Sequence, residues 1–308
     1  MEKRGYLDIS FGWMFAIMAG VIILAFAFFM AQKFIGLKNN EIDTASSKEL
    51  GTLLNPFEIG IESGSSNFIE TPSRSRLDFE CDDYGNFGSQ SISTAHESLG
   101  KFSEQSDSVS FQNKYIFSEK EIEGKKFYLF IMPFDYPYKV ADMIIITSED
   151  DEFCFVDPPS EIKSDLRRLS QDNFKINPDC SSKAKRICFS SDRNCDVVVK
   201  YDQGYVVKDG EELYFDGNLI YGAVFSDKDY YECQIKRLMK RMEQLNTIYE
   251  KKAIFLNLRG CQNNMAPDLG TLGISVSTYS SSRSLSQMSM QVKELEVKNG
   301  NSGICGLW

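Results

Sequence analysis

The sequence contains a single histidine, His96, among its 308 residues. One imidazole excludes every metal site that needs two histidine ligands, and a lone histidine in a polar segment is most often solvated rather than catalytic. Basic residues are also fewer than acidic ones, with 34 Lys and Arg and 44 Asp and Glu. The resulting negative net charge is the wrong sign for a protein that binds nucleic acid. No glycine-rich phosphate loop and no serine-hydrolase turn is present. We therefore expect no cofactor, no nucleotide, no nucleic-acid partner and no catalysis.

Acidic residues are the most abundant candidates for chemistry, because paired carboxylates can act as acid and base or can hold a cation. The densest group is Glu149, Asp150, Asp151 and Glu152, which falls between two predicted strands. A charged hairpin tip needs only water around it, so this pattern favours a solvated turn. A surface hydrolase that uses carboxylates stays as one alternative function.

The longest apolar run lies near the N-terminus. Residues 9–32 are 24 consecutive residues without a charge, and as a helix they would extend about 36 Å at roughly 1.5 Å per residue. This length covers the hydrocarbon core of a bilayer and exceeds the apolar region of a cleaved secretory signal. We predict a short cytoplasmic N-terminus at 1–8, a transmembrane helix at 9–35, an amphipathic juxtamembrane helix at 36–55, and a large domain at 56–308.

One face of the predicted membrane helix carries small side chains. Gly12, Ala16 and Gly20 recur every four residues and therefore share a face, where the backbone of a second helix could approach closely. This spacing indicates self-association or a membrane-protein partner. The other interpretation is that glycine and alanine are simply common in membrane helices.

All eight cysteines follow the predicted membrane helix, and none belongs to a C-x-x-C pair. An even number of scattered cysteines favours disulfides in an oxidising compartment over a zinc site. The basic residues on the two sides of the helix are balanced, so the cysteines decide the topology: the N-terminus is expected in the cytoplasm and the C-terminal domain outside it. The connectivity stays open, although Cys188 and Cys195 flank a predicted hairpin and could bridge it. The cysteines expected to form disulfides are Cys81, Cys154, Cys180, Cys188, Cys195, Cys233, Cys261 and Cys305.

The apolar patterning predicts an α+β domain with an antiparallel, β-rich core. The strongest strand signals are the runs at 126–133, 139–148 and 153–156, and the aromatic turn at 134–138 is expected to pack under the sheet. Residues 82–107 are rich in Ser, Asp and Gly and predict a loop. Further short strands are predicted at 187–189, 195–201, 204–207, 212–215 and 219–225.

Two or three helices are expected to pack on this core. The best candidate is 226–252, where apolar residues repeat at spacings of four and three and Ser226 resembles an N-cap. Cys233 is rotated by about 200° from the start of this apolar stripe, at roughly 100° per residue, so it should bond to a neighbouring loop. A shorter helix is expected at 160–173. Residues 282–298 fit either a helix or a strand, and a helix is favoured.

The start of the chain, MEKRG followed by the long apolar run, resembles the class III signal segment of archaeal type IV pilin-like proteins. In that family a dedicated peptidase cuts after the glycine, and the apolar helix then forms the filament core. The resemblance implies a recognition site at Lys3, Arg4 and Gly5, with Tyr6 as the first mature residue. Those proteins commonly have a glutamate five residues after the cut, a place that Ser10 takes here.

Two stretches of the large domain carry a second resemblance. YIFSEKEIEGKKFYLFIMPFDYPYKVADMIIIT and IYGAVFSDKDYYECQIKRLMKRM, with LRGC downstream, resemble an uncharacterised group of archaeal single-pass membrane proteins. This resemblance implies an architecture and no particular activity. We therefore expect a membrane-anchored cell-envelope protein with a structural or binding role of the scaffold or adhesion kind. The alternatives are a pilin-like filament subunit that polymerises through its N-terminal helix, and the carboxylate hydrolase.

Overall fold

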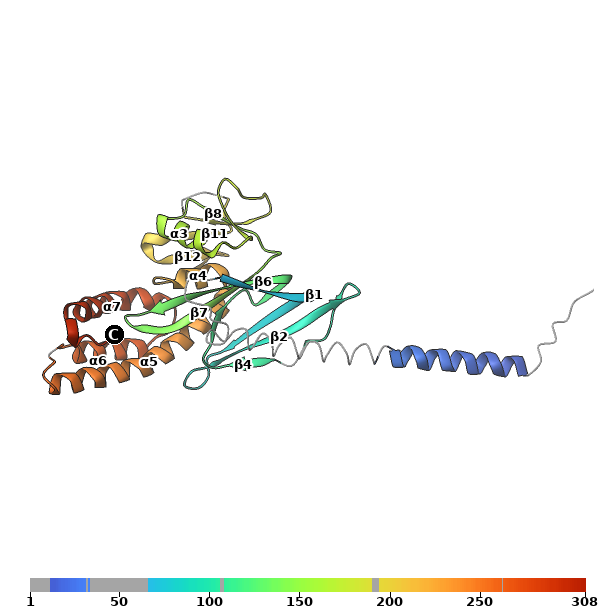
Figure 1. Ribbon diagram of the computed structural model, residues 1–308, viewed down its shortest axis with the longest axis horizontal. Helices are drawn as coiled ribbons and strands as arrows, with labels where there is room; N and C mark the ends of the chain where they lie inside the picture. The colour runs from blue at the N-terminus through green and yellow to red at the C-terminus, as the bar shows by residue number, and fades with distance from the viewer. Residues whose placement is uncertain (1–11, 32, 34–65, 106–107, 190–193, 262) are drawn as a thin grey trace, which may run out of the picture.

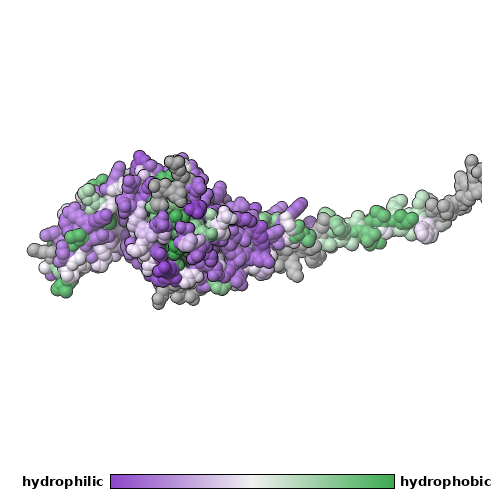
Figure 2. All heavy atoms as spheres, turned by 90° about the horizontal axis from the view of Figure 1, so that it is seen from above, coloured by the Kyte–Doolittle hydropathy of each residue, from purple (hydrophilic) through white to green (hydrophobic). Residues whose placement is uncertain are grey.

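The computed structural model describes residues 12–31, 33, 66–105, 108–189, 194–261 and 263–308. Its first element is an apolar helix, Gly12–Ala31, with a mean hydropathy of 2.6, long and apolar enough to cross a membrane. None of the apolar window is buried against the rest of the protein. Figure 2 shows hydrophobic side chains along this helix, whereas the visible surface of the domain is mostly hydrophilic. The predicted segments 1–8 and 36–55 lie outside the described residues.

The remainder of the described chain is an α+β domain with two sheets, which confirms the predicted class (Figure 1). The first sheet has the order β3-β2-β1-β6-β7-β5, with β4 paired to β2. All of its pairs are antiparallel except the pair of β5 with β7. Its strands are β1 (Ser66–Asp82), β2 (Ser89–Ser98), β3 (Lys101–Phe102), β4 (Val109–Phe111), β5 (Tyr115–Phe117), β6 (Glu121–Asp135) and β7 (Lys139–Ser148).

The second sheet is mixed, with the order β13-β12-β11-β10-β8-β9. The three pairs among β9, β8, β10 and β11 are parallel, whereas β12 pairs antiparallel with β11 and with β13, so the prediction of an antiparallel core is wrong here. Helix α3 (Ser160–Leu169) carries the chain back between β8 and β9, which is what parallel pairing requires. The strands are β8 (Phe153–Val156), β9 (Phe174–Ile176), β10 (Lys185–Cys188), β11 (Val197–Lys200), β12 (Tyr205–Lys208) and β13 (Glu211–Tyr214).

Four more helices follow the second sheet, so the described domain has five α-helices rather than two or three. Helix α5 confirms the helix predicted at 226–252, although Ser226 lies before its first turn and the hydroxyl of Ser226 has no hydrogen-bond partner. Helix α7 shows that 282–298 is helical. The bounds of the helices are α4 (Leu219–Phe225), α5 (Lys228–Leu258), α6 (Ala266–Ser277) and α7 (Arg283–Asn301).

Helix α4 replaces the strand predicted at 219–225. Every residue of α4 is buried, so no polar residue marks a helical period, and a short continuous apolar run looks the same in a buried strand. Part of the loop predicted at 82–107 is likewise wrong, because it contains β2. Small polar residues hide the alternation of β2, in which Gln90, Ile92 and Thr94 are buried.

The first sheet curls so that β2 and β5, near opposite ends of the strand order, approach each other. Ile92 of β2 and Ile116 of β5 belong to one hydrophobic cluster inside the curl. The backbone N–H of Ile116 donates to Oε1 of Gln90 at 2.9 Å. The sheet is therefore strongly curled, and β4 pairs with the edge of β2 that faces away from β1.

The main hydrophobic core is shared by both sheets and all five helices of the domain. Its centre is aromatic: the ring centroids of Phe130, Phe174 and Phe225 lie 5.3 to 6.0 Å apart. The aromatic side chains of 134–138 are buried in the same core, which confirms that this turn packs under the sheet.

All eight cysteines are paired, which confirms the prediction of disulfide bonding. Two of the bonds lie on the face of the second sheet opposite the main core, where Cys154 and Cys188 form a small cluster. Cys188 and Cys195 are bridged as expected, but β10 and β11 on either side run parallel, so the predicted hairpin is wrong. The bonds are Cys81–Cys233, Cys154–Cys180, Cys188–Cys195 and Cys261–Cys305.

Candidate functional site

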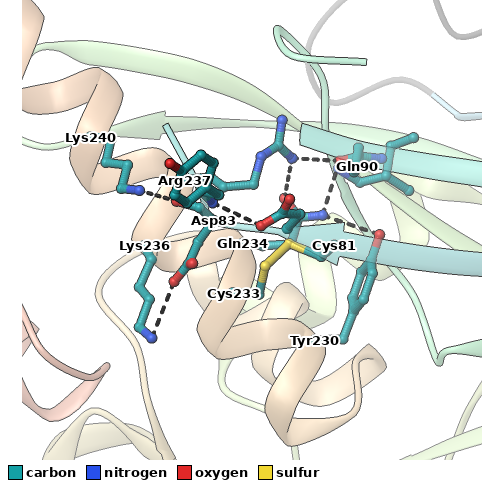
Figure 3. Close-up of a disulfide and its surroundings, with 12 residues drawn as sticks. Cys81, Asp83, Gln90, Tyr230, Cys233, Gln234, Lys236, Arg237 and Lys240 are labelled. Carbon is teal, nitrogen blue, oxygen red and sulfur yellow. Dashed lines mark hydrogen bonds and ion pairs between the residues drawn. A yellow bond between two sulfur atoms is a disulfide. The ribbon is translucent and has the colours of Figure 1, made fainter. Parts of the chain in front are cut away.

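One face of α5 contacts the hairpin that joins β1 and β2. Cys233, Lys236, Arg237 and Lys240 are spaced by three and four residues, so they share a helix face. Figure 3 shows this face turned toward Cys81 and Asp83, where β1 ends. These four α5 residues make up what we term the α5 clamp.

The covalent part of the α5 clamp is the disulfide Cys81–Cys233. Its Cα atoms are 6.2 Å apart, and it spans a sequence separation of 152 residues. The expected loop partner for Cys233 is wrong, because Cys81 lies within β1. In the chain-entropy model a closed loop of this length stabilises the folded state by about 5 kcal/mol. The bond therefore fixes the first turns of α5 to the end of β1.

The lysines of the α5 clamp hold the turn between β1 and β2. Lys236 Nζ forms an ion pair with the carboxylate of Asp83 at 3.2 Å, and Lys240 Nζ donates to the backbone carbonyl of the same residue. Gly88 ends this turn at φ +60°, and a Cβ there would stand 2.8 Å from Cγ of Arg237. Only glycine allows the turn to lie this close to the helix.

Arg237 is the charged residue of the α5 clamp that is fully buried. Its Nη1 donates to Oε1 of Gln90 at 2.9 Å and to Oε1 of Gln234 at 2.7 Å. Its Nη2 donates to two backbone carbonyls at the end of β4, and its guanidinium lies 4.9 Å from the ring centroid of Tyr115. Burial lowers the pKa of Arg237. No carboxylate of the described chain forms an ion pair with it, so carbonyl dipoles and an aromatic face take the place of a counter-charge.

Gln90 links this network to β5 of the first sheet. Its Oε1 accepts from Arg237, from Nε2 of Gln234 at 2.9 Å and from the backbone N–H of Ile116 (Figure 3 shows the first two). Three donors that converge on one atom identify it as the oxygen, which fixes the orientation of the amide group. The other end of this amide, Nε2, is buried and has no hydrogen-bond partner.

A crevice of about 530 Å³ opens beside the disulfide, between β1, β2 and the start of α5. Its floor includes three buried side chains, Phe79, Gln90 and Tyr230. The rim is exposed and carries more negative than positive charge. The charged residues of the rim are Glu80, Asp82, Asp229 and Lys120.

His96 is a buried residue of β2, so the interpretation as a solvated side chain is wrong. Its Nδ1 lies 2.5 Å from Oγ of Ser75, the pairing that a histidine-activated serine requires. Ser75 has no exposed surface and also donates to the carbonyl of Ser73. The pair joins β1 to β2 and does not present a nucleophile to a substrate.

The acidic group 149–152 lies between β7 and β8 as predicted, with Glu149 and Asp150 in an exposed turn, and its carboxylates also contact neighbouring segments. Asp150 pairs with Arg74 and Asp151 with Lys185, each at 3.0 Å. The outer two carboxylates accept backbone N–H groups. Within the described ranges, no group of three or more His, Cys, Asp or Glu is arranged to hold a metal ion.

The small residues of the N-terminal helix remain uncovered. No atom lies within 4 Å of a Cβ built at Gly12 or Gly20, and Ala16 between them is exposed. The predicted peptidase site lies outside the described residues: Lys3, Arg4 and Gly5.

Comparisons with known proteins do not assign the chain to a family. No family model matches its sequence, and neither a curated protein nor a solved structure matches it. The geometry of the crevice and of the α5 clamp is therefore the basis for a functional proposal.

Proposed function

We propose that this chain is a membrane-anchored protein of the cell envelope with a structural or binding role. The helix Gly12–Ala31 anchors it, with the N-terminus in the cytoplasm and the disulfide-containing domain outside. The observation that carries the proposal is the pairing of all eight cysteines in the domain that follows this helix. Disulfides persist in oxidising compartments and are rare in the cytosol.

Binding, without catalysis, is the role we propose for the domain. The crevice is bounded by β1 and α5, which are joined covalently and by the lysines of the α5 clamp. A recess with an apolar floor, a polar rim and rigid walls suits recognition. The candidates for catalysis are engaged elsewhere, since Ser75 is buried and the carboxylates of 149–152 bind neighbouring segments.

Protease accessibility tests the proposed location. Cells that produce the full chain with a C-terminal epitope are treated with a protease after removal of any outer wall. The epitope should disappear while a cytosolic marker survives until the cells are lysed. An epitope that survives until lysis would overturn the proposed topology.

A second candidate function, a pilin-like filament subunit, is favoured by the uncovered face of Gly12, Ala16 and Gly20. In that function the mature chain would begin at Tyr6. The intact mass of the native protein separates the two candidates: loss of the first five residues supports a filament subunit, whereas a retained Met1 counts against it.

A further inference from the structure

We propose that the crevice beside Cys81–Cys233 binds a basic segment of a peptide chain. A lysine or arginine side chain of the ligand enters the acidic rim, and a peptide carbonyl of the same segment accepts from Nε2 of Gln90. The inference rests on the proposed binding function and names the class of ligand for it.

Charge is the first argument. Three carboxylates line the rim, from Glu80, Asp82 and Asp229, against the single ammonium of Lys120. None of the three carboxylates forms an ion pair with any residue that the structure describes; Glu80 accepts from the hydroxyl of Ser91 at 3.4 Å and Asp82 from the backbone N–H of Tyr84 at 2.8 Å, and neither bond brings a positive charge. The rim therefore favours a cation and disfavours an anion.

The second argument is the orphaned donor on the floor. Gln90 is 1% exposed and lines the crevice, and its Nε2 has no partner. The three donors on its Oε1 come from Ile116 and α5, so the amide cannot turn to satisfy Nε2 within the protein. A buried N–H without an acceptor is destabilising, and a ligand carbonyl would supply the missing bond.

The third argument is the apolar part of the crevice floor, which suits the methylene stem of a basic side chain. Phe79 and Tyr230 pack edge to face, with ring centroids 6.4 Å apart. Long basic side chains bury their methylene stems on such surfaces while the charged end stays in water. A basic residue within a peptide combines all three features: a cation, an apolar stem and a nearby carbonyl.

The test is a calorimetric titration of the full chain in detergent micelles with tetralysine whose ends are acetylated and amidated. The comparison ligand is spermine, which carries the same number of positive charges but no carbonyl group. Tetralysine should bind about threefold or more tightly than spermine if Nε2 of Gln90 takes a carbonyl. Equal affinities would overturn the peptide assignment, and no binding of tetralysine would overturn the site.

Variants of the rim test where the peptide binds. Glu80→Gln combined with Asp229→Asn should weaken tetralysine binding about tenfold, and Lys120→Gln should strengthen it about threefold. A matched control removes two exposed carboxylates elsewhere, Glu104→Gln with Asp202→Asn, and should change the affinity by less than about twofold. If the two double variants weaken tetralysine binding equally, the binding depends on the net charge of the protein and not on the rim, and the proposal is overturned.

All five substituted side chains are exposed, so the thermal midpoints of these variants should stay close to that of the unmodified protein. The titration uses purified protein and is independent of cellular location. A failed titration therefore leaves the protease result intact, and a wrong topology leaves the measured affinity intact.

Discussion

The two halves of α5 are held by different kinds of contact. Residues 228–241 meet the first sheet through the α5 clamp: a disulfide, two lysines and the buried guanidinium of Arg237. Residues 242–258 meet α6 by close packing, with Gly273 against Asn246, and the outward face of this half leaves Phe255 and Leu258 exposed.

The first half of α5 is therefore held by bonds between particular atoms, whereas the second half is held by the closeness of its packing against α6. The contacts of the first half join particular atoms, and replacing the buried guanidinium of Arg237 leaves its partners without a donor in a buried place. The second half depends on the distance between α5 and α6, and adding one methyl group changes this distance only slightly. We expect substitutions in the first half to be the more destabilising.

The largest effect is expected from removing the covalent link of the first half. Cys81→Ser with Cys233→Ser should lower the free energy of unfolding by about 5 kcal/mol, because the unfolded chain regains the freedom of a long loop. The measurement is chemical denaturation in detergent micelles. As a control, Cys188→Ser with Cys195→Ser removes a bond that spans only 7 residues and should cost about 2 kcal/mol. If both double variants lose the same free energy of unfolding, the disulfide from β1 to α5 stabilises the protein no more than the short-range one does.

Arg237→Met should have the next largest effect. The variant keeps an unbranched apolar stem but leaves the side-chain oxygen of Gln234 and two carbonyls of the β4 segment without their donor, which should cost about 3 kcal/mol. Lys240→Met, on the same face but partly exposed, should cost less than about 1 kcal/mol. A more stable Arg237→Met protein would mean that desolvating the guanidinium outweighs its hydrogen bonds.

Helical periodicity predicted α5 and its orientation. Tyr231, Ile235, Leu238 and Met242 of the predicted stripe are all buried, and Cys233 faces away from them toward its disulfide partner. The apolar runs at 126–133, 139–148 and 153–156 also predicted strands, and they lie in β6, β7 and β8; the polar start of β6, at 121–125, was not predicted. Local pattern was sufficient where apolar residues repeat with a helical period, as in α5, or form a continuous run, as in β7 and β8.

The candidate site could not be predicted in the same way. Arg237 stands one residue from Lys236 and three from Lys240, so a local pattern indicates a solvated, charged face. Its burial depends on Gln90, which lies 147 positions earlier in β2, where the composition predicts a loop. The connectivity of the disulfides was open for the same reason, since the partner of Cys233 is set by how the sheet folds back on the helix.

The smallest expected effect tests the second half of α5. Gly273→Ala would place a Cβ 2.9 Å from Nδ2 of Asn246, which is buried and donates to the carbonyl of Leu269 at 2.7 Å. Displacing that amide should outweigh the helix propensity gained from alanine, for a net loss of about 1 kcal/mol.

The matched control for this last substitution lies one turn earlier on α6. A Cβ at Gly270 would stand 3.6 Å from Oε1 of Glu250, an ordinary contact, so Gly270→Ala should raise the free energy of unfolding by about 0.5–1 kcal/mol. Both variants are compared by chemical denaturation under the same conditions. If Gly273→Ala stabilises the protein as much as Gly270→Ala does, the second half of α5 tolerates a wider separation from α6, and close approach is not what holds it. The contrast between the two halves would then reduce to the α5 clamp alone.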